Sequence, residues 1–238
     1  MGNVNIESDL IINNKEVSHA SPTTTLRSHL VSDLGGTTTV QTINSVKLVD
    51  TGGTERDSAS ITASDWTFSN VTNGKRASTT KIISITANYS ISKVRLYAGT
   101  NMYFEYSLTT SMPVTSGSQI TVNITIDVTL SLTHTSGGTS TGTYVTNLGA
   151  EIVLRRFITG EYRSKRINTI GLAYGGGVIQ YVTGTVTTDS GNYRVTLNAS
   201  LNPSSDITIN EYDILTEDLY TVGGVTLQTI TLSSGVTH

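Results

Sequence analysis

Apolar and polar residues alternate without interruption from residue 120 to residue 132. Successive side chains of a β-strand point to opposite faces of its sheet, so this segment predicts one long strand with an apolar face. The apolar positions are Ile120, Val122, Ile124, Ile126, Val128, Leu130 and Leu132. An apolar face must be covered by a second layer, and the segment therefore predicts a two-layer, all-β domain.

A helical pattern and several shorter alternating segments precede this strand. Leu26, Leu30, Val31 and Leu34 recur at helical spacing and two glycines follow directly, which predicts a short helix over residues 23–34. The Asn-Gly dipeptide at residues 73 and 74 is favoured in two-residue turns and predicts a β-hairpin there. Further strands are predicted at 43–49, 66–71, 83–87, 91–97 and 102–108.

The second half of the sequence repeats features of the first half in the same order. The step Ile-Asn-Ser-Val-Lys-Leu at 43–48 returns as Ile-Asn-Thr-Ile-Gly-Leu at 167–172. In both places a segment beginning Leu-Arg comes before the step and a glycine turn comes after it. The segments 84–97 and 195–212 correspond in the same way. This order predicts an internal duplication of the chain.

These patterns lead to one prediction of the fold. The chain is expected to be all-β, with two tandem antiparallel β-sandwiches that are jelly-roll-like and carry one short helix near the start of each. The predicted boundaries place an N-terminal arm at 1–20, the first sandwich at 21–140 and the second at 141–238. A loop of threonine, serine and glycine at 133–143 is expected to separate the two sandwiches.

Composition narrows the classes of protein that fit this fold. The chain has 238 residues, no cysteine, a formal net charge of −3 and charged residues at 14% of its positions. Without cysteine there is no disulfide framework, no thiolate nucleophile and no Cys-ligated zinc. No apolar segment has the length of a membrane-spanning helix, and the first residues lack the regions of a signal peptide. We therefore expect no membrane span and no processing.

The spacing of potentially reactive residues does not match known catalytic or metal-binding motifs. The four histidines, His19, His29, His134 and His238, lie far apart and form no metal-binding spacing. No serine occurs in a Gly-x-Ser-x-Gly elbow, and the glycines at 175–177 are not followed by the Lys-Ser/Thr of a phosphate loop. We expect no catalytic residue, no metal site and no cofactor.

Two groups of residues are candidates for binding. Positive charge is concentrated at Arg155, Arg156, Arg163, Lys165 and Arg166, which could meet an anionic partner. The alternative is that these residues pair with acids of a neighbouring subunit or face water, and the lack of an aromatic platform disfavours nucleic acid. Tyr97 and Tyr103 could stack on a glycan, or they could pack against other strands. These readings remain open at this stage.

Leu10, Ile11 and Ile12 form an apolar patch near the amino terminus, between polar residues. We interpret the patch as part of the arm, which could reach a neighbouring subunit by adding a strand to an exposed sheet edge. This interpretation predicts that a chain without residues 1–20 folds but fails to assemble.

The residues at 93–106 and 113–126 carry a resemblance to a class of proteins. They read Lys-Val-Arg-Leu-Tyr-Ala-Gly-Thr-Asn-Met-Tyr-Phe-Glu-Tyr and Pro-Val-Thr-Ser-Gly-Ser-Gln-Ile-Thr-Val-Asn-Ile-Thr-Ile. Together with the short leading helix, they resemble β-sandwich structural proteins in virions of tailed phages and archaeal viruses. The resemblance implies a capsid, decoration, turret, tail or fibre subunit, located in the virion, whose partners are other copies of itself and other virion proteins. It implies no catalytic residues.

We therefore expect a non-enzymatic virion protein that forms homo-oligomers by burying surface between copies. The alternative function is a carbohydrate-binding or adhesive module that uses the two tyrosines. A polysaccharide-cleaving enzyme is disfavoured because the sequence offers no evident pair of carboxylates for glycoside hydrolysis.

Overall fold

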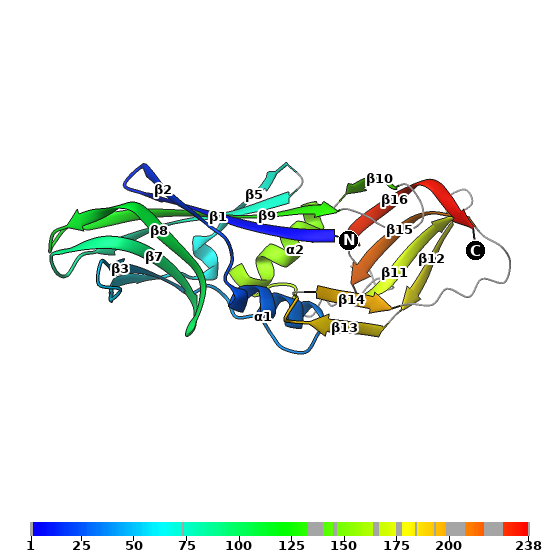
Figure 1. Ribbon diagram of the computed structural model, residues 1–238, viewed down its shortest axis with the longest axis horizontal. Helices are drawn as coiled ribbons and strands as arrows, with labels where there is room; N and C mark the ends of the chain where they lie inside the picture. The colour runs from blue at the N-terminus through cyan, green and yellow to red at the C-terminus, as the bar shows by residue number, and fades with distance from the viewer. Residues whose placement is uncertain are drawn as a thin grey trace.

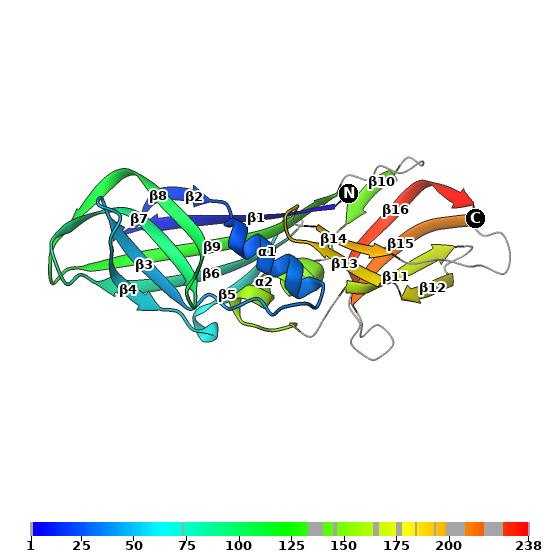
Figure 2. The same ribbon diagram turned by 60° about the horizontal axis from the view of Figure 1, so that its bottom comes forward.

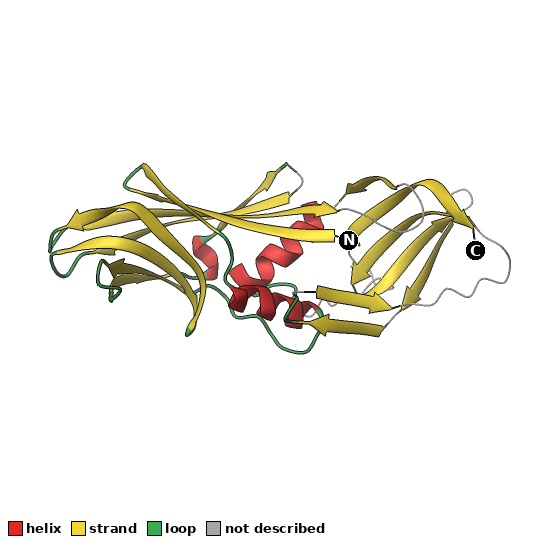
Figure 3. Cartoon of the chain, viewed as in Figure 1, coloured by secondary structure: helices red, strands yellow, loops and turns green. Residues whose placement is uncertain are grey.

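The computed structural model describes the backbone of residues 2–72, 74–132, 140–144, 147–163, 167–174, 178–183, 185–192, 194–198, 208–216 and 226–237. The described chain is mostly antiparallel β-structure with two α-helices. Figure 3 shows the helices near the middle of an elongated molecule, between the strands of its two halves. The prediction of a mostly β chain is confirmed.

Two sheets of the first half face each other (Figure 1). The five-stranded sheet has the order β2-β1-β9-β6-β5, with strands at Lys15–Ala20, Gly2–Ile12, Gln119–Leu132, Gly74–Ser84 and Thr67–Val71. The four-stranded sheet has the order β4-β3-β7-β8, with strands at Glu55–Ser60, Ser45–Asp50, Tyr89–Ala98 and Asn101–Val114. Buried residues of both sheets belong to one hydrophobic core. Burial of this apolar surface is the main contribution that holds the two layers together.

The predicted long strand is confirmed as β9 and lies at the centre of the five-stranded sheet. It pairs with β1 along one edge and with β6 along the other. The side chains of Val122, Ile124, Ile126 and Val128 are fully buried, while the residues between them are only half-buried. The alternation of the sequence therefore corresponds to the two faces of this strand.

The predicted N-terminal arm is wrong, because residues 2–20 form part of the five-stranded sheet. β1 is paired with β9 from Gly2↔Leu132 to Ile12↔Val122, and with β2 over its last five residues. Leu10 and Ile12 are buried in the core of their own chain, whereas Ile11 on the opposite face is 37% exposed. An apolar patch near a terminus thus completes a sheet within the chain.

Both predicted helices are confirmed. α1 spans Thr24–Leu34, and its first turn is capped by Thr23, whose hydroxyl oxygen accepts a hydrogen bond from the Leu26 backbone at 3.3 Å. α2 spans Asn147–Ile158, and its C-terminal half contains the segment that the sequence matched with α1. Both helices bury apolar residues against the core, including Leu26, Leu154 and Phe157.

The described strands of the second half repeat the strand order of the first half. Its larger sheet runs β10-β16-β15-β11-β12, with strands at Ser140–Tyr144, Thr226–Thr237, Thr208–Thr216, Ile167–Tyr174 and Val178–Thr183. A separate hairpin is formed by β13 and β14, at Thr185–Asp189 and Arg194–Asn198. When this sheet is read from its β12 edge, the order β12-β11-β15-β16 corresponds strand by strand to β4-β3-β7-β8 of the first half. Along the chain, the β13–β14 hairpin lies between β12 and β15, as the β5–β6 hairpin lies between β4 and β7.

Two details of the predicted architecture need correction. Three hairpins, β3–β4, β5–β6 and β7–β8, each keep both strands in one sheet. A jelly roll instead alternates most successive strands between its two sheets, so the connectivity is not that of a jelly roll. The loop predicted at 133–143 is interrupted at residue 140, where β10 begins and pairs with β16, while residues 133–139 lie outside the described residues.

The helices connect the two halves through reciprocal contacts (Figure 2). α1 packs on β8 of its own half and on the β13–β14 hairpin of the other half. α2 packs on β16 of its own half and on β6 of the other half. Because β8 corresponds to β16 and β6 to β14, these contacts relate the halves as the subunits of a symmetric dimer are related.

A buried ion pair lies where α1 and α2 meet. The Arg156 guanidinium donates to the Asp33 carboxylate at 2.5 Å, and the two side chains are 0% and 3% exposed. Each of these residues is the tenth of its helix, counted from Thr24 and from Asn147. The contact therefore joins the two helices, one from each half, through opposite charges.

A capped turn between β4 and β5 gives a prediction of pH dependence. Asp65 accepts hydrogen bonds from the Thr62 backbone at 2.6 Å and from the Thr62 hydroxyl at 2.8 Å, and it forms an ion pair with Lys81. These bonds favour the ionised carboxylate and lower its pKa from 3.8 to about 2. The stabilisation is present above the unfolded pKa and is lost as the pH falls through the folded pKa.

We therefore expect the Asp65→Asn variant to have a lower thermal midpoint than the wild type at neutral pH. The difference should shrink as the pH is lowered from 3.8 towards 2. Thermal unfolding of both proteins at a series of pH values measures this, and NMR of the Asp65 carboxyl carbon measures its pKa directly. A measured pKa at or above 3.8 would contradict the assignment.

Candidate functional site

Two residues of the predicted positive patch, Arg155 and Arg156, are paired with acids of the same chain. The Arg155 guanidinium donates to Glu151 at 2.6 Å and to Glu161 at 3.0 Å, and its central carbon lies 3.8 Å from the centre of the Phe68 ring. Arg156 is fully buried against Asp33, and Arg163 is half-buried, while Lys165 and Arg166 lie outside the described residues. Glu151 lies on the same helix as Arg155, Glu161 follows that helix and Asp33 belongs to α1, so the partners of Arg155 and Arg156 are acids of the same chain and not of a neighbouring subunit.

The two tyrosines predicted to stack on a glycan are placed differently. Tyr103 is fully buried, and its hydroxyl accepts a hydrogen bond from the Gln41 backbone at 3.2 Å and contacts the His29 ring. Its ring is therefore not available to a ligand. The Tyr97 hydroxyl donates to Glu55, and the Lys47 ammonium lies 4.4 Å from the centre of the Tyr97 ring. Tyr97 is half-buried and engaged by its neighbours.

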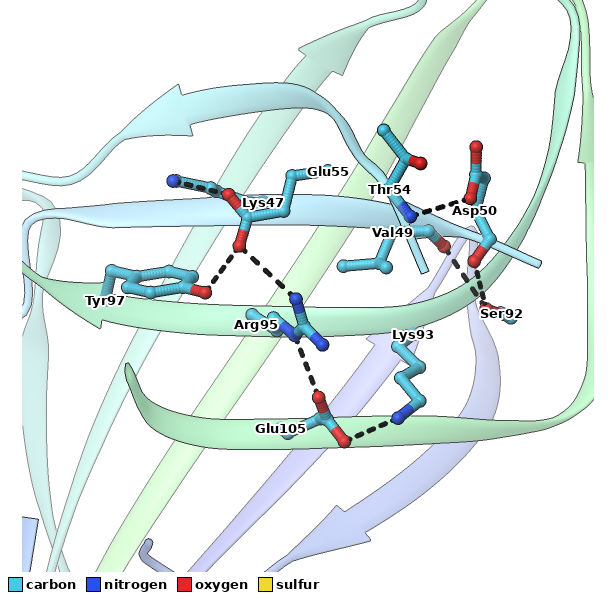
Figure 4. A network of polar contacts seen from close by, with 10 residues as sticks. All are labelled: Lys47, Val49, Asp50, Thr54, Glu55, Ser92, Lys93, Arg95, Tyr97 and Glu105. Atoms are coloured by element: carbon cyan, nitrogen blue, oxygen red, sulfur yellow. Dashed lines mark hydrogen bonds and ion pairs between the residues drawn. The ribbon is translucent and has the colours of Figure 1, made fainter. Parts of the chain in front are cut away.

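Alternating acids and bases cover the outer face of the four-stranded sheet (Figure 4). Glu55 of β4 accepts hydrogen bonds from Lys47 of β3 at 2.7 Å and from Arg95 of β7 at 3.4 Å. Glu105 of β8 accepts from Lys93 at 2.7 Å and from Arg95 at 2.8 Å. The bonds from Lys47 and Lys93 lower the pKa values of Glu55 and Glu105, so both are ionised at neutral pH. The face is polar, and its acids and bases are paired with one another.

A lysine, an amide and a carboxylate come together beneath α2, at a place the sequence did not indicate. The Lys75 ammonium of β6 lies 3.1 Å from the Asn70 amide oxygen of β5 and 2.7 Å from a Glu151 carboxylate oxygen of α2. The Lys75 and Glu151 side chains are only 15% and 16% exposed. We call these three residues the Lys75 cluster.

The register of the β5–β6 hairpin creates this cluster. The ladder pairs Val71 with Gly74 and Asn70 with Lys75, so Gly74 is the first residue of β6 and is not in the turn. A Cβ atom on Gly74 would lie 2.2 Å from the Val128 carbonyl oxygen of β9. A glycine is therefore required here because β6 and β9 approach each other closely. The Asn-Gly dipeptide alone instead suggests that the glycine is needed for the turn.

Other potential sites are less well formed in the described part of the chain. A shallow hollow of about 340 Å³ beside α1 is lined by Thr24, Thr25, Ser28, His29 and Ser190. Within the described ranges no three His, Cys, Asp or Glu side chains are grouped so that they could hold a metal ion. The acidic residues at 217 and 218 lie outside these ranges. None of the described helices is long and apolar enough to cross a membrane.

Comparison with known proteins assigns no family. No family model, no curated protein and no solved structure matches this chain.

Proposed function

We propose that this chain is a non-enzymatic structural subunit of a virion and that it assembles with copies of itself and with other virion proteins. The observation that carries the proposal is the repeated strand order of the two halves, joined by reciprocal helix contacts. A chain that already contains two corresponding units presents repeated surfaces, and repeated surfaces favour regular assembly.

The proposal includes a finer description of the two halves as tandem β-sandwiches. The first sandwich is formed by the two facing sheets of strands β1 to β9. In the second, the β13–β14 hairpin packs on β11 of the larger sheet, as a small second layer. The paired charges on the outer face of the β4-β3-β7-β8 sheet fit a subunit surface that contacts water or other subunits.

The edge of β14 is the candidate point of assembly. β6 pairs with β5 on one side. On its other side it pairs with β9 along eleven residue pairs. Its counterpart β14 pairs with β13, and among the described strands it has no second neighbour. A two-stranded hairpin is marginally stable by itself. We propose that a strand of a second copy adds to this edge, as β9 of the same chain adds to β6.

The oligomeric state of the purified protein tests this function. We expect light scattering coupled to size-exclusion chromatography, with electron microscopy, to show particles or filaments of regular geometry. A monomer at all concentrations up to the millimolar range would contradict the proposal.

Two proline variants test the edge. Backbone N–H groups of successive residues in a strand point to opposite edges, so Val195→Pro and Thr196→Pro remove donors from opposite edges of β14. We expect one of them to reduce assembly without lowering the thermal midpoint. Unchanged assembly in both would rule out the β14 edge.

A glycan array with wild type and Tyr97→Ala tests the alternative function of an adhesive module, because a shell subunit should give no sugar signal.

A further inference from the structure

The Lys75 cluster places an amine beside an amide carbonyl and a carboxylate on the inner side of a sheet. Lys75 and Asn70 are directly opposite each other on neighbouring strands, and Glu151 approaches from α2 above them. The amine is 3.1 Å from the amide oxygen, so the carbonyl carbon of Asn70 lies one bond beyond that contact. The three groups are thus within reach of a reaction that joins the amine to the amide carbon.

The surroundings of Lys75 are apolar for a lysine. On β9 it is paired with Val128, which is fully buried, and two residues along β6 lies Ala77, which is also fully buried. Water therefore has limited access to the amine, whose side chain is 15% exposed. Asn70 lies on an edge strand and is exposed, which leaves a path for a small leaving group into solvent.

We propose that Lys75 and Asn70 form an intramolecular amide bond in the folded chain, with Glu151 as the proton acceptor. The Lys75 nitrogen, after it has given a proton to Glu151, attacks the carbonyl carbon of Asn70. A new carbon–nitrogen bond forms, and the bond between this carbon and the Asn70 side-chain nitrogen breaks. The proton held by Glu151 passes to that nitrogen, which leaves as ammonia, and the second proton of the attacking Lys75 nitrogen passes to the Glu151 carboxylate and then to solvent. No oxidant, metal or cofactor takes part, and the chain reacts only once.

Glu151 is ionised and lies within hydrogen-bond distance of the Lys75 ammonium. Burial raises its pKa, but hydrogen bonds from Lys75 and from Arg155 outweigh this effect, and the net pKa is lower than usual. The carboxylate is therefore ionised before the reaction and can accept a proton. Arg155 fixes its orientation through a bond of 2.6 Å to the other carboxylate oxygen. Arg155 is in this sense a positioning residue.

The bond would fasten the edge strand β5 to β6 and would resist the opening of that edge. The loop that it closes is short, so the gain in global stability is small and the local effect is larger. The inference does not depend on the proposed virion function, because it concerns chemistry within one folded chain.

Intact mass spectrometry of the purified full-length protein tests the bond. We expect a mass lower than the sequence mass by one ammonia. Trypsin should not cleave after a modified Lys75, so the digest should contain the peptide 57–76, lighter by one ammonia, in place of the peptide 57–75. Fragmentation should show the link between residues 70 and 75. A protein of full mass that trypsin cleaves after Lys75 would overturn the proposal.

Variants assign the roles and control for folding. Lys75→Arg keeps a positive charge for Glu151 but cannot form the bond, and Asn70→Thr removes the acceptor at an exposed strand position. Both should show the full mass expected from their sequences, with circular dichroism spectra like that of the wild type. Glu151→Gln should also retain the ammonia if the carboxylate is the proton acceptor, and complete bond formation in this variant would overturn its role.

The matched control is Lys81→Arg. Lys81 lies on the same face of β6, is 18% exposed and forms an ion pair with Asp65 at 2.9 Å. This variant should lose one ammonia as the wild type does. A loss of the modification in Lys81→Arg would show that any disturbance of β6 prevents the reaction, and the assignment to the Lys75 cluster would then fail.

Discussion

Deletion of residues 1–12 is expected to unfold the first half of the chain, and not merely to prevent assembly. β1 lies between β2 and β9, so its loss leaves the edge of β9 without a hydrogen-bonding partner along eleven residue pairs. Ile6, Leu10 and Ile12 are 6%, 0% and 1% exposed. Burial of each such side chain contributes about 1.5–3 kcal/mol, and whole domains are stable by only about 5–15 kcal/mol.

The measurement is chemical denaturation of the truncated and intact proteins, followed by circular dichroism. The truncated protein should show no cooperative transition for the first half. Two neighbouring point variants provide a matched comparison. Leu10→Ala should lower the free energy of unfolding by about 2–5 kcal/mol. Ile11→Ala, on the exposed face, should lower it by less than about 1 kcal/mol. A truncated protein that folds normally would restore the interpretation of residues 1–20 as an arm.

Replacement of Asp33 by Ala is expected to lower the free energy of unfolding by about 3–5 kcal/mol, because it leaves the Arg156 charge in the interior without its carboxylate. Removal of a single partner from a buried ion pair is more harmful than replacement of both. The double variant Asp33→Leu, Arg156→Met should therefore be more stable than Asp33→Ala alone. Since the pair joins α1 to α2, its loss should also weaken the contact between the two halves.

Urea denaturation of the single and double variants measures this effect. Glu161→Ala is the matched control, because it removes a carboxylate from an arginine of the same helix at a site where the acid is 49% exposed. Exposed ion pairs contribute little, so this variant should lose less than about 1 kcal/mol. Equal losses for Asp33→Ala and Glu161→Ala would show that the buried pair has no special role in joining the halves.

Local pattern was sufficient to predict elements whose own residues carry the signal. The alternation of residues 120–132 predicted β9, and the helical spacing that ends at Leu34 predicted α1. In both cases the period of the apolar positions matches the geometry of the element. The correspondence between 43–48 and 167–172 pointed to two halves with a shared order of elements, which the matching strand orders now support.

Interactions between distant residues could not be predicted in this way. The sequence shows that Arg156 is basic and that Tyr103 is aromatic, but it does not show that both are fully buried. Their partners, Asp33 and Gln41, are supplied by the packing of other elements. The sequence therefore left open whether these residues bind a partner or pack within the chain, and the packing of other elements decides it for Arg156 and Tyr103.

The sequence by itself determined elements such as β9 and α1, because the two-residue and 3.6-residue periods are properties of a single segment. The tertiary structure alone decided that β1 closes a sheet, that α1 and α2 pack across the two halves, and that Lys75 meets Asn70 and Glu151. Strand register and helix packing depend on which surfaces meet in space. The close approach of Gly74 to Val128 of β9 is one such contact, which the Asn-Gly dipeptide alone does not reveal.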